Sequence, residues 1–309
     1  MRLSIASVTV AFNAAAVLPR QMDALLWQTR PLQEIVVVDN GSTDGTGEML
    51  AERYSQVKVL PIQQNGSPGL AMSTGMAYAA LEKRHDWVWI FDADSIPEPD
   101  TLNRLLAGVA TAGGENGNER IGMASPLLFH RETGEYYPPL YWRDGYVTPD
   151  ANSLQEPILF VDLVLGSGLL MRRELVETIG LLHAGMVMYF QDFEYCLRAR
   201  AHGFEIAVVT GSKLAHEVGH PREIRLPGFP RLWPIHAPWQ EYYMARNLVY
   251  AAWHLYSNRK TKVFAVRHLA RHAVGAALFS PKKLACLVKM AQGFSDGRHG
   301  RLGARFQLR

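Results

Sequence analysis

The sequence predicts an α/β fold with a mostly parallel β-sheet flanked by helices. Short apolar runs suited to buried strands alternate with helix-like segments through residues 3–95, and this alternation is typical of a parallel sheet with crossover helices. Polar turn residues follow the strands directly. Apolar residues make up 48% of the chain and charged residues 20%, which indicates a folded globular protein.

The first segments set the pattern. Leu3–Val10 is rich in β-branched residues that alternate with Ser and Thr, which favours a strand over a secretory signal. Asn13 is a candidate N-cap for a helix that runs to about Gln28. Glu34–Val38 is short and apolar, as expected for a strand buried on both faces, and Thr46–Tyr54 follows as a helix.

The pattern continues toward the middle of the chain. Val57–Pro61 and Trp87–Phe91 are predicted strands on either side of a helix over Leu70–Lys83. Trp87 and Trp89 are expected in the core. Further segments are a loop over Gly113–Asn118, apolar strands over Ile158–Leu165 and Ile206–Val209, and an aromatic, proline-rich loop over Tyr136–Trp142. This loop is either a platform for a sugar ring or a hydrophobic hairpin buried against the sheet.

Length and cysteine content limit the class of protein. The 309 residues suit one large or two modest domains. We predict a domain over residues 1–235, with halves at about 1–110 and 111–235, and a helical extension over residues 236–309. Cys196 and Cys286 are too few for a disulfide scaffold. No apolar run approaches the roughly 20 residues of a membrane-spanning helix.

The net charge of +3 combines two opposite regions. Residues 258–309 contain twelve basic residues and one acidic residue, whereas the other residues carry a formal charge of −8. Such an asymmetry suggests that the C-terminal region meets an anionic partner.

The C-terminal region is predicted to form two helices. The first covers Val263–Phe279, and the second begins at Ser280-Pro281. Helical spacing places four basic or titratable residues on one face of the first helix: Arg267, His268, Arg271 and His272. Basic amphipathic helices of this kind lie in membrane interfaces; the alternative is a helical cap packed on the preceding domain or on another subunit. Gly293–Arg309 is expected to be mobile.

Polar loops follow three of the predicted strands, at Phe12-Asn13, Asp39–Asp44 and Asp92–Ser95. In doubly wound sheets, ligands bind beyond the carboxyl ends of the strands. A dinucleotide-dependent oxidoreductase would need Gly-x-Gly-x-x-Gly after the first strand, and the sequence lacks that motif. The loops therefore predict a different ligand at this edge of the sheet.

The pair Asp92 and Asp94 suggests a metal site. Two carboxylates one residue apart, just past a buried strand, can both face one hard cation, and oxygen ligands suit Mg²⁺ or Mn²⁺, which in turn binds phosphate. The alternative is an ordinary turn and helix-cap sequence.

Five stretches resemble the family 2 glycosyltransferases, which are inverting sugar transferases with the Rossmann-like GT-A fold. They are Val10–Asn13, Val37–Thr46, Asn65–Gly75, Asp92–Asp94 and Tyr189–Arg198. The resemblance extends over about residues 1–250. It is closest to bacterial rhamnosyl- and galactofuranosyltransferases, which share an Asp-x-Glu-x-x-x-Arg block, a downstream His and a Tyr-Tyr-x-x-Arg-Asn segment. In this chain these are Asp192–Arg198, His216 and Tyr242–Asn247.

The resemblance implies a role for each matching residue. Asp192 is the general base, and the metal ligands for Mn²⁺ or Mg²⁺ are Asp92, Asp94 and His216, with His220 a weaker substitute. The nucleotide-sugar contacts are Phe12, Asn13, Asp39, Asn40, Gly41, Ser42, Asn65, Gly69, Asp92 and Ala93. Acceptor contacts are expected at Trp142, Gly166, Ser167, Gly168 and Gln191.

Several of these residues have structural alternatives. Asp39 and Asp44 are each suited to capping a turn or a helix. Arg198 is a possible partner for Asp192 and, at better helical spacing, for Glu194. His216 is alternatively a solvated loop residue.

The predicted function is a metal-dependent inverting glycosyltransferase. Its donor is of the UDP-galactofuranose or dTDP-rhamnose type, and its acceptor is a glycan or a lipid-linked saccharide of the bacterial cell envelope. We expect it in the cytoplasm, peripherally bound to the inner face of the membrane, and a homo-oligomer is one of the two oligomeric states left open, beside a monomer. The alternatives are a non-catalytic or regulatory sugar-nucleotide-binding protein and a sugar nucleotidyltransferase. The basic region lacks the interleaved aromatic residues expected of a nucleic-acid-binding segment, and the chain lacks the spans of a processive synthase.

Overall fold

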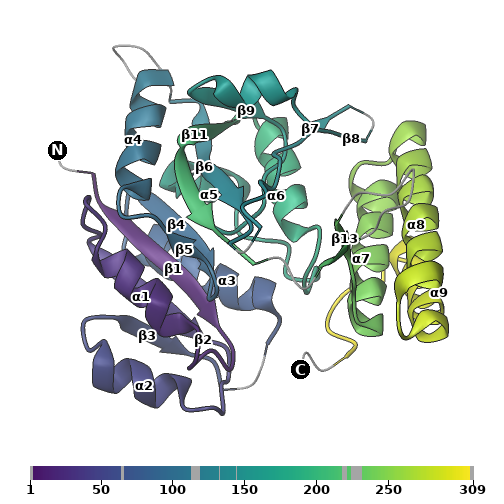
Figure 1. The fold of residues 1–309 in the computed structure, drawn as a ribbon, viewed down its shortest axis with the longest axis horizontal. Coiled ribbons are helices and arrows are strands. Elements are labelled where there is room, and N and C mark those ends of the chain that lie inside the picture. Colours follow the sequence, from purple (N-terminus) through teal and green to yellow (C-terminus); the bar gives the residue numbers. More distant parts are fainter. Residues whose placement is uncertain are drawn as a thin grey trace. The chain divides into compact units, whose positions relative to one another are not determined.

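A computed structural model of the protein describes residues 3–63, 66–112, 119–131, 133–143, 145–217, 221–223 and 232–306. The chain forms two compact units (Figure 1). The first unit consists of residues 1–142, 146–184 and 195–217, and the second of residues 143–145, 185–194 and 218–309. The division at residue 235 drawn from the sequence stays a prediction.

The N-terminal half of the sheet is parallel, as predicted. Strands β1 (Ile5–Ala11), β2 (Glu34–Asp39), β3 (Lys58–Pro61) and β4 (Trp87–Asp92) lie in the order β3-β2-β1-β4, and all three pairings are parallel. The crossovers contain α1 (Leu18–Leu26), α2 (Thr46–Arg53) and α3 (Pro68–Met76), which continues into the π-helical turn η1 (Ala77–Glu82). This half of the fold therefore follows the apolar pattern of the sequence closely.

Beyond β4 the sheet is mixed. Strand β10 (Leu169–Arg172) lies antiparallel between β4 and β6 (Ile121–Phe129), and β11 (Glu205–Ala215) runs parallel to β6. The short strands β5 (Ile96–Pro97) and β9 (Ile158–Val161) pair antiparallel with β11. The remaining elements of this half are α4 (Thr101–Ala112), the hairpin β7 (Tyr141–Trp142) and β8 (Tyr146–Val147), the 3₁₀ helix η3 (Ala151–Gln155), α5 (Arg173–Ile179) and α6 (Gln191–Ala201). The predicted loop over Gly113–Asn118 lies outside the described residues.

The core of the first unit lies on both faces of the sheet. Trp87 and Trp89 are buried, as expected, and Trp89 Nε1 donates a hydrogen bond of 2.8 Å to the carbonyl of Gly168. Gly75 of α3 packs directly on β1 and β2, because a Cβ there would collide with the side chains of Val8 and Val38. The absence of a side chain at this position lets the helix approach the sheet.

The start of α1 differs from the prediction. Asn13 is not its N-cap; the helix begins at Leu18 with Pro19 in its first turn, where proline fits well. Asn13 instead adopts a left-handed conformation with φ of 48°, which Asn tolerates better than most residues. Its side chain bonds the neighbouring loop, and this tertiary contact outweighs its local capping tendency.

The second unit is mainly helical. It contains α7 (Pro238–Tyr250), the π-helical turn η4 (Ala251–Leu255), α8 (Arg259–Phe279) and α9 (Lys283–Arg298), with the two-stranded β12 (Pro221–Glu223) and β13 (Leu232–Pro234). Thus the predicted C-terminal helices are present. Helix α9 starts at Lys283 rather than at Ser280-Pro281, since Ser280 ends α8 and its Oγ accepts a hydrogen bond from the Lys282 amide.

The prediction of a mobile C-terminal end was wrong for residues 293–306. Gly293 and Gly297 lie on the face of α9 that packs on α7, where a Cβ would collide with the carbonyl oxygens of Tyr242 and Arg246. Beyond α9, the amides of Arg305 and Phe306 donate hydrogen bonds to the Tyr243 hydroxyl. The glycines that suggested flexibility instead permit close helix packing. Residues 307–309 lie outside the described part of the chain.

Candidate active site

The three polar loops lie side by side in the first unit. Strand β1 is flanked by β2 and β4, and the register pairs Val10 with Asp92 and Ala11 with Asp39. The carboxyl ends of the three parallel strands therefore end at one level, and the loops that follow them share one edge of the sheet.

Hydrogen bonds join the loops after β1 and β2. The Asn13 amide donates to Ser42 Oγ at 2.9 Å, and Asn13 Oδ1 accepts from the Thr43 amide at 2.8 Å. Asp44 accepts hydrogen bonds from the amides of Ala15 and Thr46. Burial disfavours the charged form of Asp44, but these hydrogen bonds and one from the Thr46 hydroxyl outweigh it and lower the pKa of the carboxyl. The prediction that Asp44 is the N-cap of α2 was wrong, because Gly45 occupies that position; Asp44 instead joins the start of α2 to the loop after β1.

Asp39 and Asn40 hold the start of the second loop. Asp39 Oδ1 accepts a hydrogen bond of 3.0 Å from the Ser42 amide. Asp39 therefore caps the turn after its strand, which is the structural alternative considered from the sequence. Asn40 is buried, and its side-chain amide exchanges two hydrogen bonds with the backbone of Gly66, at 3.0 and 2.9 Å. Asn40 thus joins this loop to the segment before α3.

The other predicted donor contacts are distributed over the same edge. Phe12 and Ala93 are half-buried, as are Gly41 and Ser42, whereas Gly69 is buried in the first turn of α3. Asn65 lies outside the described residues. Contact of any of these residues with a nucleotide stays a prediction.

The loop after β4 brings two carboxylates to a buried histidine. His216, directly after β11, has its Nδ1 at 3.3 Å from Asp94 Oδ1 and its Nε2 at 3.9 Å from Asp92 Oδ2. The carboxylate side chains are 61% and 40% exposed for Asp92 and Asp94, whereas the imidazole is 10% exposed. The solvated-loop alternative for His216 is therefore wrong, and residues 124 positions apart in the chain meet in one cluster.

The hydroxyl groups of two buried serines, Ser95 and Ser167, contact this cluster and the turn that carries it. Ser95 Oγ lies 2.8 Å from His216 Nδ1 and 2.6 Å from Ser167 Oγ. The Asp92 amide donates to Ser167 Oγ at 3.1 Å, so this predicted acceptor residue is buried beneath the Asp-Ala-Asp turn. Gln21, fully buried on α1, donates to the carbonyls of Asp92 and Ser95.

The sequence analysis missed Ser95 and Gln21. Both carried a weak signal, since Ser95 adjoins the aspartate pair and Gln21 is a polar residue on the apolar face of its helix, among Leu18, Met22 and Leu25.

The cluster fits a hard divalent cation. Two partly exposed carboxylates provide oxygen ligands of the kind that Mn²⁺ and Mg²⁺ prefer. Because Ser95 engages Nδ1 of His216, Nε2 is the nitrogen left to face an ion, and metal-binding histidines usually have their other nitrogen held in this way. Burial opposes charging of His216, but the hydrogen bond with Asp94 and the carboxylates of Asp92 and Asp94 raise its pKa. The electrostatic field at the imidazole is thus one that favours a cation.

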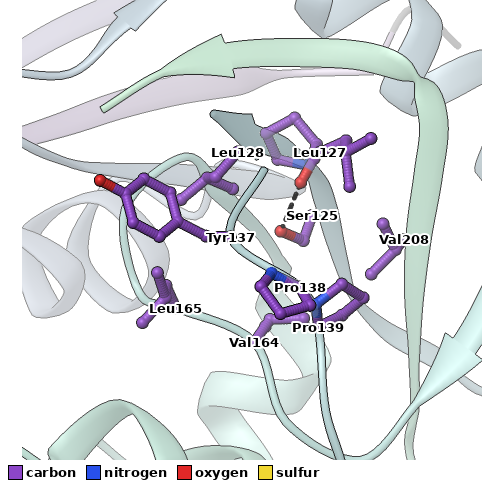
Figure 2. A pocket seen from close by; sticks show the side chains of 10 residues that line it. Ser125, Leu127, Leu128, Tyr137, Pro138, Pro139, Val164, Leu165 and Val208 are labelled. Carbon is purple, nitrogen blue, oxygen red and sulfur yellow. Dashed lines mark hydrogen bonds between the residues drawn. The ribbon is translucent and has the colours of Figure 1, made fainter. Parts of the chain in front are cut away.

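A pocket lies near this cluster (Figure 2). It is lined by Ser125, Pro126, Leu127, Leu128, Tyr137, Pro138, Pro139, Val164, Leu165 and Val208. The Tyr137 ring also faces the His216 ring, with centroids 6.3 Å apart in an edge-to-face arrangement. The aromatic loop is therefore neither fully buried nor fully exposed: Tyr137 lines the pocket, whereas Tyr136 is 44% exposed.

The predicted acceptor residues near the pocket have structural contacts. The Trp142 amide donates to Asp162 Oδ2 at 2.9 Å, and its ring packs edge-on against Tyr146. The Gly168 amide donates to the Ile90 carbonyl, and its φ of 75° places it in the left-handed region that favours glycine. The Gly166 carbonyl accepts from the Leu169 amide. An acceptor contact for each of them stays a prediction.

The proposed base, Asp192, belongs to the second unit and lies in the first turn of α6. Its Oδ1 accepts a hydrogen bond of 2.9 Å from the Phe193 amide, and a helix N-terminus stabilises a negative charge. Tyr189 and Phe190, just before α6, both have positive φ, 60° and 63°. Two consecutive non-glycine residues in this region are strained, and such strain persists only where other contacts impose it.

Helix α7 imposes that strain. Asn247 Nδ2 donates to the carbonyls of Met188 and Tyr189, at 2.6 and 2.9 Å. Arg246, fully buried, donates to Asn247 Oδ1 at 2.9 Å and to the Gly185 carbonyl at 3.0 Å. The Arg-Asn end of the Tyr-Tyr-x-x-Arg-Asn segment therefore fixes the turn that precedes Asp192, a role that the sequence alone did not reveal.

Arg198 and Gln191 complete the α6 block. In the first unit, the Arg198 guanidinium donates to the carbonyls of Ile179 and Leu181, at 2.6 and 3.0 Å. In the second unit, the Oε1 atom of Gln191 is buried without a hydrogen-bond partner among the described residues. Its predicted contact with the acceptor is untested.

Comparisons with known proteins show which family and which relatives the chain is similar to. Residues 7–114 match the family described as Glycosyl transferase family 2. The chain is 24% identical over 249 residues to dTDP-rhamnosyl transferase RfbF of Shigella flexneri, a match that covers 80% of this chain and 79% of that protein. It is 23% identical over 241 residues to N-acetylglucosaminyl-diphospho-decaprenol L-rhamnosyltransferase of Mycobacterium tuberculosis, covering 69% and 76%.

Two solved structures share the fold. GalNAc-T7, crystallised with UDP, GalNAc and Mn²⁺, superimposes with a TM-score of 0.65 at 18% identity, over 96% of this chain and 56% of that one. This chain thus spans about half the length of GalNAc-T7. Residues 1–349 of S. aureus TarS in complex with UDP-GlcNAc give a TM-score of 0.58 at 15% identity, over 96% and 80%. At these identities the likeness concerns the fold.

Proposed function

Because the chain carries a family 2 glycosyltransferase domain with the GT-A fold and is a glycosyltransferase, we propose that it transfers a deoxyhexosyl or furanosyl residue from a nucleoside diphosphate to a saccharide acceptor. The reaction is one displacement at the anomeric carbon, with inversion of configuration. The observation that carries the proposal is the meeting of Asp92, Asp94 and His216 at the strand ends.

Each part of the site has a separate task. The joined loops at Asn13, Asp39 and Ser42 position the nucleoside. Asp92, Asp94 and Nε2 of His216 would hold Mn²⁺ or Mg²⁺, which, when bound, offsets the negative charge that develops on the departing diphosphate. Asp192 accepts the proton of the attacking hydroxyl as the new bond forms. With the base opposite the leaving group, the anomeric configuration inverts.

The relatives favour dTDP-rhamnose as the first donor to examine. One is a dTDP-rhamnosyl transferase, and the name of another specifies an N-acetylglucosaminyl-diphospho-decaprenol acceptor. We extend both features to this chain as a proposal, with UDP-galactofuranose as the second donor. The acceptor is then a lipid-linked saccharide of a bacterial cell-envelope polysaccharide.

The C-terminal helices provide a surface suited to such an acceptor. Side chains of α8 and α9 that are 46–76% exposed include Val263, Val266, Val274, Leu278, Leu284 and Val288. Exposed basic residues lie on the same helices or next to them: Arg267 and Arg271 on α8, Lys283 at the start of α9, and Lys282 just before it. Apolar side chains beside basic ones suit an anionic membrane surface, and we place the enzyme at the cytoplasmic face of the membrane. Among the described residues, no helix has the length and hydropathy to cross a bilayer.

A panel of nucleotide sugars tests the proposed function. Each donor is added to the purified chain with Mn²⁺ or with a chelator, and thermal stabilisation and donor hydrolysis are measured. We expect dTDP-rhamnose or UDP-galactofuranose to stabilise the chain and to be hydrolysed only with the metal. Stabilisation without turnover on any acceptor would support a non-catalytic binder, and product formation from a sugar phosphate and a nucleoside triphosphate would support a nucleotidyltransferase.

A further inference from the structure

A second cluster of ligand-type side chains lies within the helical unit. His236 precedes α7, Glu241 lies in its first turn, and His272 belongs to α8. One nitrogen or oxygen of each residue lies within 4.8 Å of those of the other two. His236 Nδ1 is 3.4 Å from Glu241 Oε1, and the rings of His236 and His272 are parallel within 4° at a centroid distance of 6.1 Å.

Two buried polar atoms of this cluster make no hydrogen bond among the described residues. Glu241 is 4% exposed, and only its Oε1 atom approaches His236, whereas Oε2 has no hydrogen-bond partner in that part of the chain. His236 Nδ1 is also buried and makes no hydrogen bond there. A buried carboxylate oxygen without a hydrogen bond is costly, and a bound cation would remove this cost.

The ring next to His272 holds one of the ligand histidines in place. His268 stacks on His272, with ring centroids 4.7 Å apart, and so restricts its orientation.

We propose that His236, Glu241 and His272 form a divalent-metal site, separate from the Asp92–Asp94–His216 cluster, and that its ion is Zn²⁺. Two imidazoles and one carboxylate are a common zinc donor set, with a fourth position open to water, whereas Mg²⁺ and Ca²⁺ prefer oxygen ligands. The site does not depend on the proposed sugar transfer.

The ion would join parts of the second unit that are far apart in sequence. It would bind the segment before α7 to α8, and the Tyr189 ring contacts the His236 ring at a centroid distance of 5.6 Å. Tyr189 belongs to the strained turn before Asp192. The bound ion would therefore stabilise the unit that carries the proposed base.

Zinc binding to the full chain, without an affinity tag, tests the proposal. A chelator first removes any bound metal from the chain, which is then titrated with Zn²⁺ alone. Elemental analysis gives the number of Zn²⁺ ions bound per chain, and competition with a chromophoric chelator gives the affinity. Asp94→Ala disables the strand-end cluster and is expected to keep one tight Zn²⁺ equivalent. Glu241→Gln and His272→Gln should each weaken that equivalent by more than about 100-fold, since even the loss of a residue that only supports a ligand costs 10–100-fold.

His268→Gln is the control for a residue that only supports a ligand: His268 stacks on His272 but is not a ligand, so this variant should keep the Zn²⁺ equivalent with a smaller loss of affinity than either ligand variant. If the ligand variants fail to fold, Co²⁺ added to the unmodified chain gives a second measurement. We expect the strong visible bands of four-coordinate Co²⁺, which Zn²⁺ abolishes. The proposal is overturned if Asp94→Ala binds no Zn²⁺ tightly, or if folded Glu241→Gln and His272→Gln bind Zn²⁺ as tightly as the unmodified chain. It is also overturned if Co²⁺ gives only the weak bands of six-coordinate geometry.

Discussion

At the scale of single residues, Asp192 carries the proposed proton transfer. We expect Asp192→Asn to lower kcat by about 10²–10⁴-fold, the usual contribution of a general base, because the amide cannot accept the proton of the acceptor hydroxyl. Affinity for the donor and the metal should not change, as measured by calorimetry beside steady-state kinetics. Asp100→Asn, which removes only an exposed pair with Arg104, is the control. A variant at Asp192 with near wild-type kcat would remove this residue from the role.

Asp296 gives a pH-dependent prediction at the same scale. It is buried, accepts a hydrogen bond of 2.7 Å from the Tyr242 hydroxyl, and pairs with Arg305. Burial opposes its charged form, but these hydrogen bonds outweigh burial and lower the pKa of Asp296 below the ordinary 3.8. A lowered native pKa means that the stabilisation is complete above the ordinary pKa and is lost as the pH falls through the native one.

We therefore expect Asp296→Asn to reduce the free energy of unfolding by about 1–3 kcal/mol above pH 5. The difference from the wild type should shrink as the pH falls below the ordinary pKa of 3.8, because the unfolded carboxylate then takes up a proton before the native one does. Urea unfolding of both proteins from pH 3 to pH 7 measures this difference in the free energy of unfolding. A difference that grows on acidification would contradict the assignment.

At the scale of elements, α7 fixes the turn before α6. Asn247→Ala removes two hydrogen bonds to a turn with two left-handed residues, and we expect the turn to relax and displace Asp192. The expected result is a lower kcat, with donor affinity unchanged and unfolding weakened by about 1–3 kcal/mol. The pH dependence of kcat should also shift, which a purely structural loss would not cause. Asn152→Ala on the exposed part of η3 serves as the control, and unchanged kcat in Asn247→Ala would contradict the positioning role.

The elements also show what local sequence can and cannot predict. Strands β2 and β4 were predictable because a strand buried on both faces is apolar along its length, and β1 because of its β-branched residues. The start of α1 was not, because Asn13 has a partner 30 residues away, at Thr43. The packing of Gly293 and Gly297 against α7 could not be predicted for a similar reason. Glycine in a sequence suggests flexibility, and only the structure shows that a helix packs closely against these two.

In the candidate site, too, some residues were predictable from the sequence, whereas others depend on tertiary contacts. Asp92 and Asp94 were predicted from their position after a buried strand, His216 was predicted from the resemblance to the family, and the structure brings the three together. Ser95, Gln21 and the Arg246–Asn247 pair were not assigned, since their contacts reach across the tertiary structure. The predicted basic face on α8 was partly wrong: burial lowers the pKa of His268 to about 4 and that of His272 to about 3, so only Arg267 and Arg271 provide charge near neutral pH.

At the scale of the whole molecule, the charge asymmetry predicts membrane association. The twelve basic residues after residue 257 should bind vesicles that contain anionic lipid and release them at high salt, because each basic residue near the surface contributes about 1 kcal/mol that salt screens. Flotation with anionic and neutral vesicles measures this, and Arg267→Glu with Arg271→Glu should reduce it. Equal binding to both kinds of vesicle would contradict the proposal.

The central claim is that Asp92, Asp94 and His216 hold the cation to which the donor diphosphate binds. Calorimetry of the nucleoside diphosphate, with and without Mn²⁺, tests it most directly in the wild type and in Asp94→Ala. We predict that Mn²⁺ strengthens nucleotide binding to the wild type by at least about tenfold, or 1.4 kcal/mol, and that Asp94→Ala abolishes this gain while binding without metal stays the same. An equal gain from Mn²⁺ in both proteins would contradict the account.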